Sequence, residues 1–456
     1  MGFRPRRNTL VVCICARREP VSDATAKKEE RRKFQAIKGT RDIRPPETAL
    51  WNRVEQTAHE VFATFGFGEI RLPIFEPTEL FARAVGGETD IVSKEMYSFE
   101  DRDETSISLR PEATASVCRA YLEHGMQSLP QPVKLYYMGP MFRRERPQKG
   151  RYRQFYQIGA EVLGGTDAPA IDAEIIEMLM AFFDKVGLQG ATLYINSIGH
   201  NAENCRRGYV DKLRTELAKI KDNLCPDSQR RIDTNPLRVL DSKLESEQPY
   251  IERLPRIADH LCDECKAHYA AVKRQLELRG VLYQENWRLV RGLDYYMRTT
   301  FEITAPGLGS QNAVCGGGRY DGLVELLGGP PTKGIGFAIG EDRLILSLQE
   351  SGKAKIEPGR DVYIAWMGEH AYAAAIRAAK DLRKAGFSVE LPPAEQKFGT
   401  ALGQADKLGA KYALILGDDE VSEGLWTLKT LSTGEQQKFP EPELLEFLRQ
   451  QKTVSS

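Results

Sequence analysis

The segment Phe142-Arg-Arg-Glu-Arg-Pro-Gln-Lys-Gly-Arg-Tyr-Arg153 joins two strand-like runs, Val133 to Met138 and Phe155 to Val162. It carries six basic side chains and one acid in twelve residues, and Pro147 and Gly150 mark it as a loop. One interpretation is a solvated charged turn. The other is a loop that binds a polyphosphate, because the planar arginine fork matches two oxygens at once.

Short strands and helices surround this loop without regular alternation. A helix is predicted from Glu47 to Phe65, where apolar side chains recur at helical spacing. Further strand-like runs are Glu69 to Pro73 and Thr105 to Leu109. Several short strands with intervening helices predict a mixed, mainly antiparallel sheet. We therefore expect an α+β domain over residues 36–350.

The chain changes character between about residues 199 and 281, where it is helical, charge-rich and contains four prolines. Strand-like runs resume at Trp287 to Arg291 and Thr299 to Thr304, so this part is predicted to be an inserted helical subdomain. Within it, Cys262-Asp-Glu-Cys265 has the spacing of metal ligands, with Cys225 upstream. A structural zinc is one interpretation. A second cysteine pair is missing and the six histidines form no ligand motif, so we expect no structural metal.

The C-terminal part has a different pattern. Residues 351–360 are predicted to be a linker, and residues 361–456 a separate small α/β domain. Strands are expected at Val362 to Met367, Phe387 to Leu391 and Tyr412 to Leu416, with helices between them. This alternation is typical of a parallel or mixed sheet covered by helices.

Composition narrows the class of protein. The 64 basic and 64 acidic residues cancel, so a nucleic-acid surface would need local basic clusters. A hydrophobic content of 41% and a charged content of 28% are ordinary for a globular protein. Eight cysteines are too sparse for a disulfide framework, which favours reduced thiols and a cytoplasmic location. No apolar run approaches the roughly 18 residues of a membrane span.

The first 35 residues differ from the rest of the chain. A short apolar run, Leu10 to Ala16, is followed by the charged tract Ala26 to Lys33. We expect a disordered basic tail over residues 1–35. An organelle transit peptide is the alternative, because the segment is rich in arginine although it also contains acidic residues.

Three further segments could contribute to a ligand pocket. Gly334 to Arg343 is a strand that enters a helix through alternating glycines, which suits either a closely bound ligand or close strand–helix packing. In Arg110-Pro-Glu-Ala-Thr114, Thr114 is either a helix cap or part of a pocket. Gln157 and Glu161 lie four apart on a strand, so both face one side and suggest a polar pocket.

The stretch Arg291-Gly-Leu-Asp-Tyr-Tyr296 places a cation, a carboxylate and two phenols around a glycine. Because the chain has no Ser/His/Asp pattern and no Walker loop, no residue stands out as nucleophile or base. Arginines, glycines and polar pocket groups are instead typical of phosphoryl or adenylyl transfer by positioning and charge stabilisation.

Together these segments resemble the histidyl-tRNA synthetases, a family of class II aminoacyl-tRNA synthetases, and the likeness runs from Lys38-Gly-Thr-Arg-Asp-Ile43 to the C-terminal domain. The class II motifs are the helix and strand ending at Pro73, Phe142-Arg-Arg-Glu145 with its loop and Phe155, and Gly336 to Arg343. The histidine-specific segments are Arg291 to Tyr296 and Gly316-Gly-Gly-Arg-Tyr-Asp321.

The resemblance implies an activity and partners. ATP and histidine would form histidyl-adenylate and pyrophosphate, and the histidyl group would then pass to the 3′ end of its tRNA. It also implies magnesium held mainly by the ATP phosphates, a homodimer built around the first motif, and an anticodon-binding C-terminal domain.

Residue by residue, the resemblance implies that Arg143 bridges the α-phosphate and the histidine carboxylate. Arg343 would hold the γ-phosphate, and Arg291 would stabilise charge on the α-phosphate. The other ATP contacts would be Glu145, Arg151 and Phe155. The histidine pocket, which Arg143 and Arg291 adjoin, would be lined by Glu112, Ala113, Thr114, Gln157, Glu161, Tyr295 and Tyr296.

Three other classes of protein share part of this pattern. A non-catalytic, synthetase-like regulatory subunit of histidine biosynthesis would lack the C-terminal domain and parts of the site. A ligase for another amino acid would lack the Arg291 to Tyr296 stretch. A simple RNA-binding module would not need Arg343 and the glycine strand before it.

Overall fold

The computed structural model describes residues 34–87, 89–290, 293, 295–309, 312–352 and 359–455. The expected tail, apart from its last two residues, and the middle of the expected linker lie outside these ranges. Among the described residues, no helix is long and apolar enough to cross a membrane.

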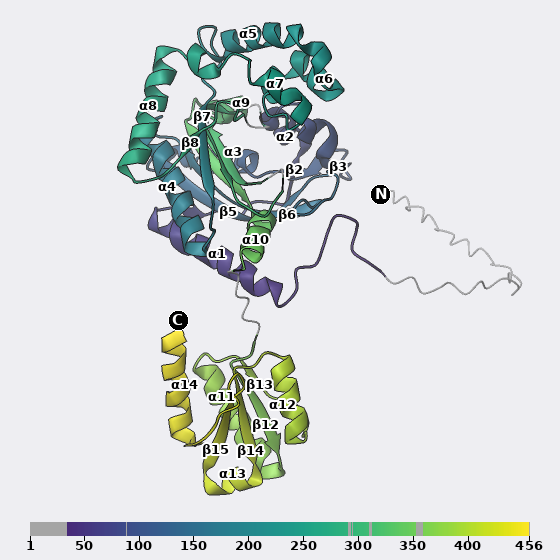
Figure 1. Ribbon diagram of the computed structural model, residues 1–456, viewed down its shortest axis with the longest axis vertical. Helices are drawn as coiled ribbons and strands as arrows, with labels where there is room; N and C mark the ends of the chain where they lie inside the picture. The colour runs from purple at the N-terminus through teal and green to yellow at the C-terminus, as the bar shows by residue number, and fades with distance from the viewer. Residues whose placement is uncertain are drawn as a thin grey trace, which may run out of the picture. The chain divides into compact units, whose positions relative to one another are not determined.

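An eight-stranded sheet, in the order β1-β5-β6-β11-β10-β9-β7-β8, forms the centre of the larger part of the chain (Figure 1). The six inner strands pair antiparallel, and β1 and β8 add parallel edges. In this order, the strands span Gly68–Glu69, Val133–Phe142, Gln154–Leu163, Gly334–Gly340, Ala313–Arg319, Met297–Thr304, Thr192–Ser197 and Gln284–Glu285. The prediction of a mainly antiparallel sheet is confirmed.

Helices α1 (Glu47–Thr64) and α4 (Pro169–Val186) cover one face of this sheet (Figure 1). The apolar stripe of α1 is buried against Ile158, Ala160 and Val162 of β6. Since neighbouring side chains of a strand point to opposite faces, Gln157 and Glu161 point to the other side.

That opposite face carries α3 (Thr114–Glu123), α2 (Thr78–Val85) and the short α9 (Leu323–Leu326), which share a second core. A three-stranded sheet, β2-β4-β3, lies in the same region of the chain. Its strands span Phe75–Pro77, Ser106–Leu109 and Tyr97–Glu100. Gln157 and Glu161 therefore lie on the face of the large sheet that α3 covers.

Between β7 and β8 the chain forms a helical insertion with its own apolar core. Its helices are α5 (Arg206–Lys219), α6 (Pro226–Thr234), α7 (Gln248–Ile251) and α8 (Asp263–Leu278). Helix α8 also packs against α4. The helical character expected from the prolines and charges of this segment is present.

The C-terminal domain has a five-stranded sheet, in the order β13-β12-β14-β15-β16. These strands span Val389–Glu390, Val362–Met367, Tyr412–Gly417, Leu425–Thr430 and Gln436–Pro440. The first three are parallel, as the α/β pattern predicts, and the last two add an antiparallel ribbon. Its helices are α11 (Glu369–Lys384), α12 (Phe398–Lys407), α13 (Asp418–Glu423) and α14 (Glu441–Ser455). Helices α11 and α14 share one core, and α12 packs on a second.

Candidate active site

A cavity of about 600 Å³ opens beside the loop between β5 and β6. Its wall combines that loop with the end of β11, the start of α10 (Glu341–Glu350), strand β10 and residues of the insertion. Arg143, Arg151 and Arg343 all line it. Two cations of the loop thus meet a third from α10 at one cavity, which suits an anionic ligand.

Arg143 is held from two sides. Its Nε donates a hydrogen bond to the carbonyl oxygen of Pro111 at 2.9 Å. Its guanidinium lies 5.3 Å from the centre of the Phe155 ring, within the range of a cation–π contact. The fork is therefore oriented before any ligand arrives, and the remaining face of Phe155 is suited to stacking on a base.

Arg343 lies in the first turn of α10, and its Nε donates to the carbonyl oxygen of Ala313 at 2.6 Å. Burial lowers the pKa of Arg343, and the nearby Arg151 lowers it further. Arg151 itself pairs with Glu145 at 3.2 Å. This crowding of positive charge favours a bound anion, which would relieve the repulsion between the two guanidinium groups.

An N-terminal segment braces the loop. The backbone N–H of Arg153 donates to the carbonyl oxygen of Gly39 at 2.7 Å. Arg41 lies 5.0 Å from the centre of the Tyr152 ring and forms a 3.2 Å ion pair with Asp342. Asp342 also accepts from the backbone N–H of Tyr156 at 2.9 Å. The loop and the start of α10 are thereby fixed to each other.

Glu112 caps helix α3. Its carboxylate accepts from the backbone N–H groups of Thr114 at 2.7 Å and Ala115 at 3.0 Å. Burial raises the pKa of Glu112, while these hydrogen bonds lower it. The sequence pattern assigns the possible capping role to Thr114. The side chain that caps the helix is instead that of Glu112, because its longer reach spans the first turn.

Glu161 lies in a buried polar cluster, as its place beside Gln157 on the strand suggested, and the structure adds Tyr320 and Tyr137 to it. Its carboxylate accepts a hydrogen bond from the phenol of Tyr320. Burial raises the pKa of Glu161 to about 8. Gly336 lies directly opposite Glu161, and a Cβ there would collide with that carboxylate. The buried Tyr137 belongs to the same cluster, where burial and then Glu161 raise the pKa of its phenol.

Of Gln157 and Glu161, Gln157 is the one that lines the cavity. It is buried, and its Oε1 has no hydrogen-bond partner among the described residues. A buried acceptor without a donor costs free energy, so this oxygen suits a ligand that carries an N–H group.

The two tyrosines at the end of the Arg291 to Tyr296 stretch pack on each other, with ring centres 4.8 Å apart. Tyr295 also meets Tyr320 edge to face at 5.6 Å. Burial raises the pKa of Tyr295. Arg291, Gly292 and Asp294 lie outside the described residues. The tyrosines, Glu161 and Thr114 thus form one cluster on the face of the sheet that also carries Gln157, and Ala113, fully buried, directly precedes α3.

Arg319 of the Gly316 to Asp321 segment has a structural role. It is 1% exposed and forms buried ion pairs with Asp172 of α4 and, at 2.9 Å, with Asp321. These ion pairs hold β10 to α4. They also fix the position of Tyr320, the residue after Arg319, whose phenol binds the Glu161 carboxylate.

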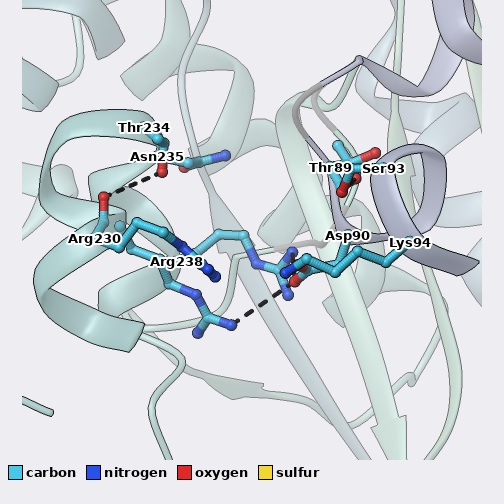
Figure 2. A pocket seen from close by; sticks show the side chains of 9 residues that line it. Thr89, Asp90, Ser93, Lys94, Arg230, Thr234, Asn235 and Arg238 are labelled. Carbon is cyan, nitrogen blue, oxygen red and sulfur yellow. Dashed lines mark hydrogen bonds and ion pairs between the residues drawn. The ribbon is translucent and has the colours of Figure 1, made fainter. Parts of the chain in front are cut away.

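A second hollow of about 230 Å³ adjoins the cavity. In Figure 2, Asp90 and Lys94 face Arg230 and Arg238 of the insertion. Asp90 pairs with Arg238 at 3.7 Å. Because Asp90 and Arg238 also line the cavity, this ion pair marks where the insertion meets the site. No sequence motif indicated these residues, which lie far apart along the chain.

The comparisons with known proteins agree with this geometry. The family model described as "Histidyl-tRNA synthetase" matches residues 39–344, and one described as "Anticodon binding domain" matches residues 361–451. The histidine–tRNA ligase of Solibacter usitatus is 54% identical over 90% of this chain and 98% of its own length. That of Koribacter versatilis is 53% identical over 91% of this chain and 96% of its own length.

Solved structures show the same likeness. The apo histidyl-tRNA synthetase of S. aureus superposes with a TM-score of 0.74 and is 38% identical. The match covers 91% of this chain and 100% of that one. With the sheet, the cavity and both matched domains in place, the chain belongs to the histidyl-tRNA synthetase family of class II aminoacyl-tRNA synthetases.

Proposed function

We propose that the cavity joins histidine to ATP, forming histidyl-adenylate and pyrophosphate, and then transfers the histidyl group to tRNA. The chain is a class II aminoacyl-tRNA synthetase, and its curated relatives are histidine–tRNA ligases over nearly their whole length. The observation that carries the proposal is the meeting of Arg143, Arg151 and Arg343 beside Gln157. Cations for a triphosphate thus lie next to an unpaired acceptor for an amino acid.

In this proposal the arginines stabilise charge that grows on the phosphates during attack by the histidine carboxylate. Arg143 bridges the carboxylate and the α-phosphate, since its fork is held in place by Pro111 and Phe155. Arg343 binds the γ-phosphate. Arg291 is assigned to the α-phosphate by family resemblance. Phe155 stacks on the adenine, and Glu145 and Arg151 complete the ATP contacts.

Magnesium bound together with ATP would supply positive charge beside its phosphates. Glu145 and Glu302 place carboxylate oxygens on the cavity wall, and oxygen is the ligand that magnesium prefers. The donor set fits this ion.

Histidine selection falls to the polar cluster in this proposal. The Gln157 oxygen and the Glu161 carboxylate accept N–H groups of histidine, and Tyr295 and Tyr296 enclose the side chain. Thr114 and Ala113 lie beside the ring. Glu112 acts as a positioning residue, because its oxygens are occupied by the first turn of α3. An apolar competitor would leave these acceptors unpaired, which is an effective basis for rejection.

We further propose the domain limits 36–350 for the catalytic part, with an insertion at about 199–281, a linker at 351–360 and an anticodon-binding part at 361–456. Residues 1–35 are proposed to be a disordered tail. We also propose a homodimer in the cytoplasm. The alternative of a regulatory subunit is not favoured, since the C-terminal domain is present and Arg143 and Arg343 line the cavity.

The test is histidine-dependent exchange of labelled pyrophosphate into ATP, followed by charging of a histidine tRNA transcript. We expect exchange with histidine, none without an amino acid, and charging in proportion to enzyme. Absence of exchange over a full magnesium titration would contradict the catalytic assignment. Faster exchange with another amino acid would contradict the assignment of the histidine pocket.

A further inference from the structure

Four side chains with metal-binding donors meet at the base of the helical insertion. The donor atoms of His200, Cys205, Cys262 and Cys265 all lie within 4.8 Å of one another. Cys205 and Cys265 are buried, and His200 and Cys262 are half-buried. This group is separate from the cavity, whose wall contains none of these residues.

Two distant segments supply the four side chains. His200 and Cys205 belong to the loop between β7 and α5, and Cys262 and Cys265 belong to the start of α8. Gly199 makes the approach possible, because it has a φ of +63° and a Cβ there would lie 2.6 Å from the Cys205 sulfur. The backbone N–H of Cys262 points to the same sulfur at 3.5 Å.

The donor atoms lie close to the spacing expected around one tetrahedral ion. His200 Nδ1 lies 3.1 Å from the Cys265 sulfur and 3.7 Å from the Cys262 sulfur. Zinc–ligand bonds of about 2.0 Å to nitrogen and 2.3 Å to sulfur place neighbouring ligand atoms roughly 3.5 to 3.8 Å apart. Ordinary packing of small apolar thiols does not require an imidazole nitrogen among three sulfurs.

We propose that His200, Cys205, Cys262 and Cys265 bind one zinc ion. Thiolates with one imidazole are a donor set that selects zinc over hard cations such as magnesium. Four protein ligands leave no open position, so the ion is structural and not catalytic. Cys205 and Cys262 each precede a helix, and the positive ends of these helices stabilise thiolates.

The proposed ion lies where the insertion is connected to the segment that carries Tyr296. Arg206 follows Cys205 and donates to the carbonyl oxygen of Tyr296. On the other side of His200, Ile198 and Gly199 exchange backbone hydrogen bonds with Arg298, each of 2.8 Å. The zinc therefore ties the insertion to the chain segment that carries Tyr296. Removal of the metal loosens both.

This proposal replaces the expectation of no structural metal. That expectation grouped Cys225 with the Cys262–Cys265 pair and found no second pair. Cys225 instead begins α6, where its sulfur accepts from the backbone N–H of Ser228 at 3.4 Å. The missing ligands are His200 and Cys205, which have no regular spacing in the sequence and meet the pair only through the fold.

The test uses the full chain expressed in zinc-supplemented medium and dialysed without chelator. Elemental analysis gives zinc per chain, and cobalt exchange gives an absorption spectrum of the wild-type protein that needs no variant. We expect one zinc per chain and, with cobalt, intense bands of a tetrahedral thiolate site. Cys262→Ser and Cys265→Ser should lower the zinc content by about tenfold or more.

Two further variants sharpen the result. Cys225→Ser is the matched control in the same subdomain and should keep its zinc. His200→Cys should also keep zinc and should strengthen the thiolate-to-cobalt band, because a fourth sulfur replaces nitrogen. Chelation should lower the unfolding temperature of the wild type. The proposal is overturned by wild-type protein without zinc and without a tetrahedral cobalt spectrum. A disulfide among Cys205, Cys262 and Cys265 in mass spectra of unreduced protein, or equal zinc loss in Cys225→Ser, also overturns it.

Discussion

Tyr320 donates its phenolic hydrogen bond to the Glu161 carboxylate across strand β11, which lies between the strand of Glu161 and the strand that Tyr320 follows. The bond passes over two glycines. A Cβ at Gly334 would meet the Tyr320 ring, and one at Gly336 would meet the Glu161 carboxylate. The glycine-rich strand therefore serves the pocket by leaving room for this pair.

Glu161 should give the ligand-free protein a distinctive pH dependence. Burial raises the pKa of Glu161 to about 8, so the folded state binds a proton that the unfolded state releases above about pH 4.3. The contribution of Glu161 to the free energy of unfolding is then fully present at low pH. It is lost as the pH rises from about 4.3 through 8, by at most about 1.4 kcal/mol per pH unit.

Chemical denaturation of wild type and Glu161→Gln over this pH range measures the effect. The stability difference, wild type minus variant, should fall steadily as the pH rises. A difference that is independent of pH would contradict a protonated Glu161. The same variant should raise the KM for histidine by about tenfold, since the loss of a buried hydrogen-bond partner costs about 1–3 kcal/mol.

Gly336→Ala should damage the histidine pocket. The new Cβ would overlap the Glu161 carboxylate and lie 2.6 Å from the carbonyl oxygen of Ala160. Such overpacking costs about 1–3 kcal/mol of stability. Relative to wild type, we expect the KM for histidine to rise more than the KM for ATP. Thermal unfolding and exchange kinetics measure both effects.

Gly403→Ala is the control for this substitution. Gly403 lies within α12, and a Cβ there meets nothing within 4 Å. Alanine in a helix interior is favoured over glycine by about 1 kcal/mol, so the control should be slightly more stable with unchanged kinetics. If Gly336→Ala and Gly403→Ala have the same stability and the same KM for histidine, the histidine pocket does not need the space that Gly336 leaves for Glu161.

Gln157→Met should change binding and stability in opposite directions. The side chain keeps its length but loses an acceptor that has no partner among the described residues. We expect the ligand-free protein to be as stable as wild type or more so, while the KM for histidine rises about tenfold. Gln154→Met, on the same strand but outside the cavity wall, should leave the KM unchanged. A loss of stability in Gln157→Met with normal histidine binding would contradict the assigned role.

Arg143→Ala should lower the rate constant of pyrophosphate exchange by about 10² to 10³, the effect of removing one preorganised donor to a developing charge. Arg143→Lys restores the charge without the fork and should recover only part of the rate. Arg207→Ala is the matched control, because Arg207 is an exposed arginine on α5 that pairs with Glu203. Near-normal exchange in Arg143→Ala would show that another cation bridges the two substrates.

Much of the fold was predictable because its signals are local. The apolar stripe of α1, the alternation of β6 and the α/β order of the C-terminal domain each depend on neighbouring residues. The same alternation predicts that Gln157 and Glu161 share one face of their strand. Clustered arginines and glycines likewise identify Arg143 and Arg343 as candidates, and both line the cavity.

The sequence by itself determined the types of element, their order and the chemistry available to the site, since helical and strand periodicity arise from backbone geometry within a few residues. Only the tertiary structure decided which distant groups meet. The order of strands brought Tyr320 to Glu161, and the first turn of α3 bound the carboxylate of Glu112. The turn at Gly199 brought the sulfur of Cys205 to the backbone of Cys262. These pairings depend on packing and strand order across the whole sheet, which no local pattern encodes.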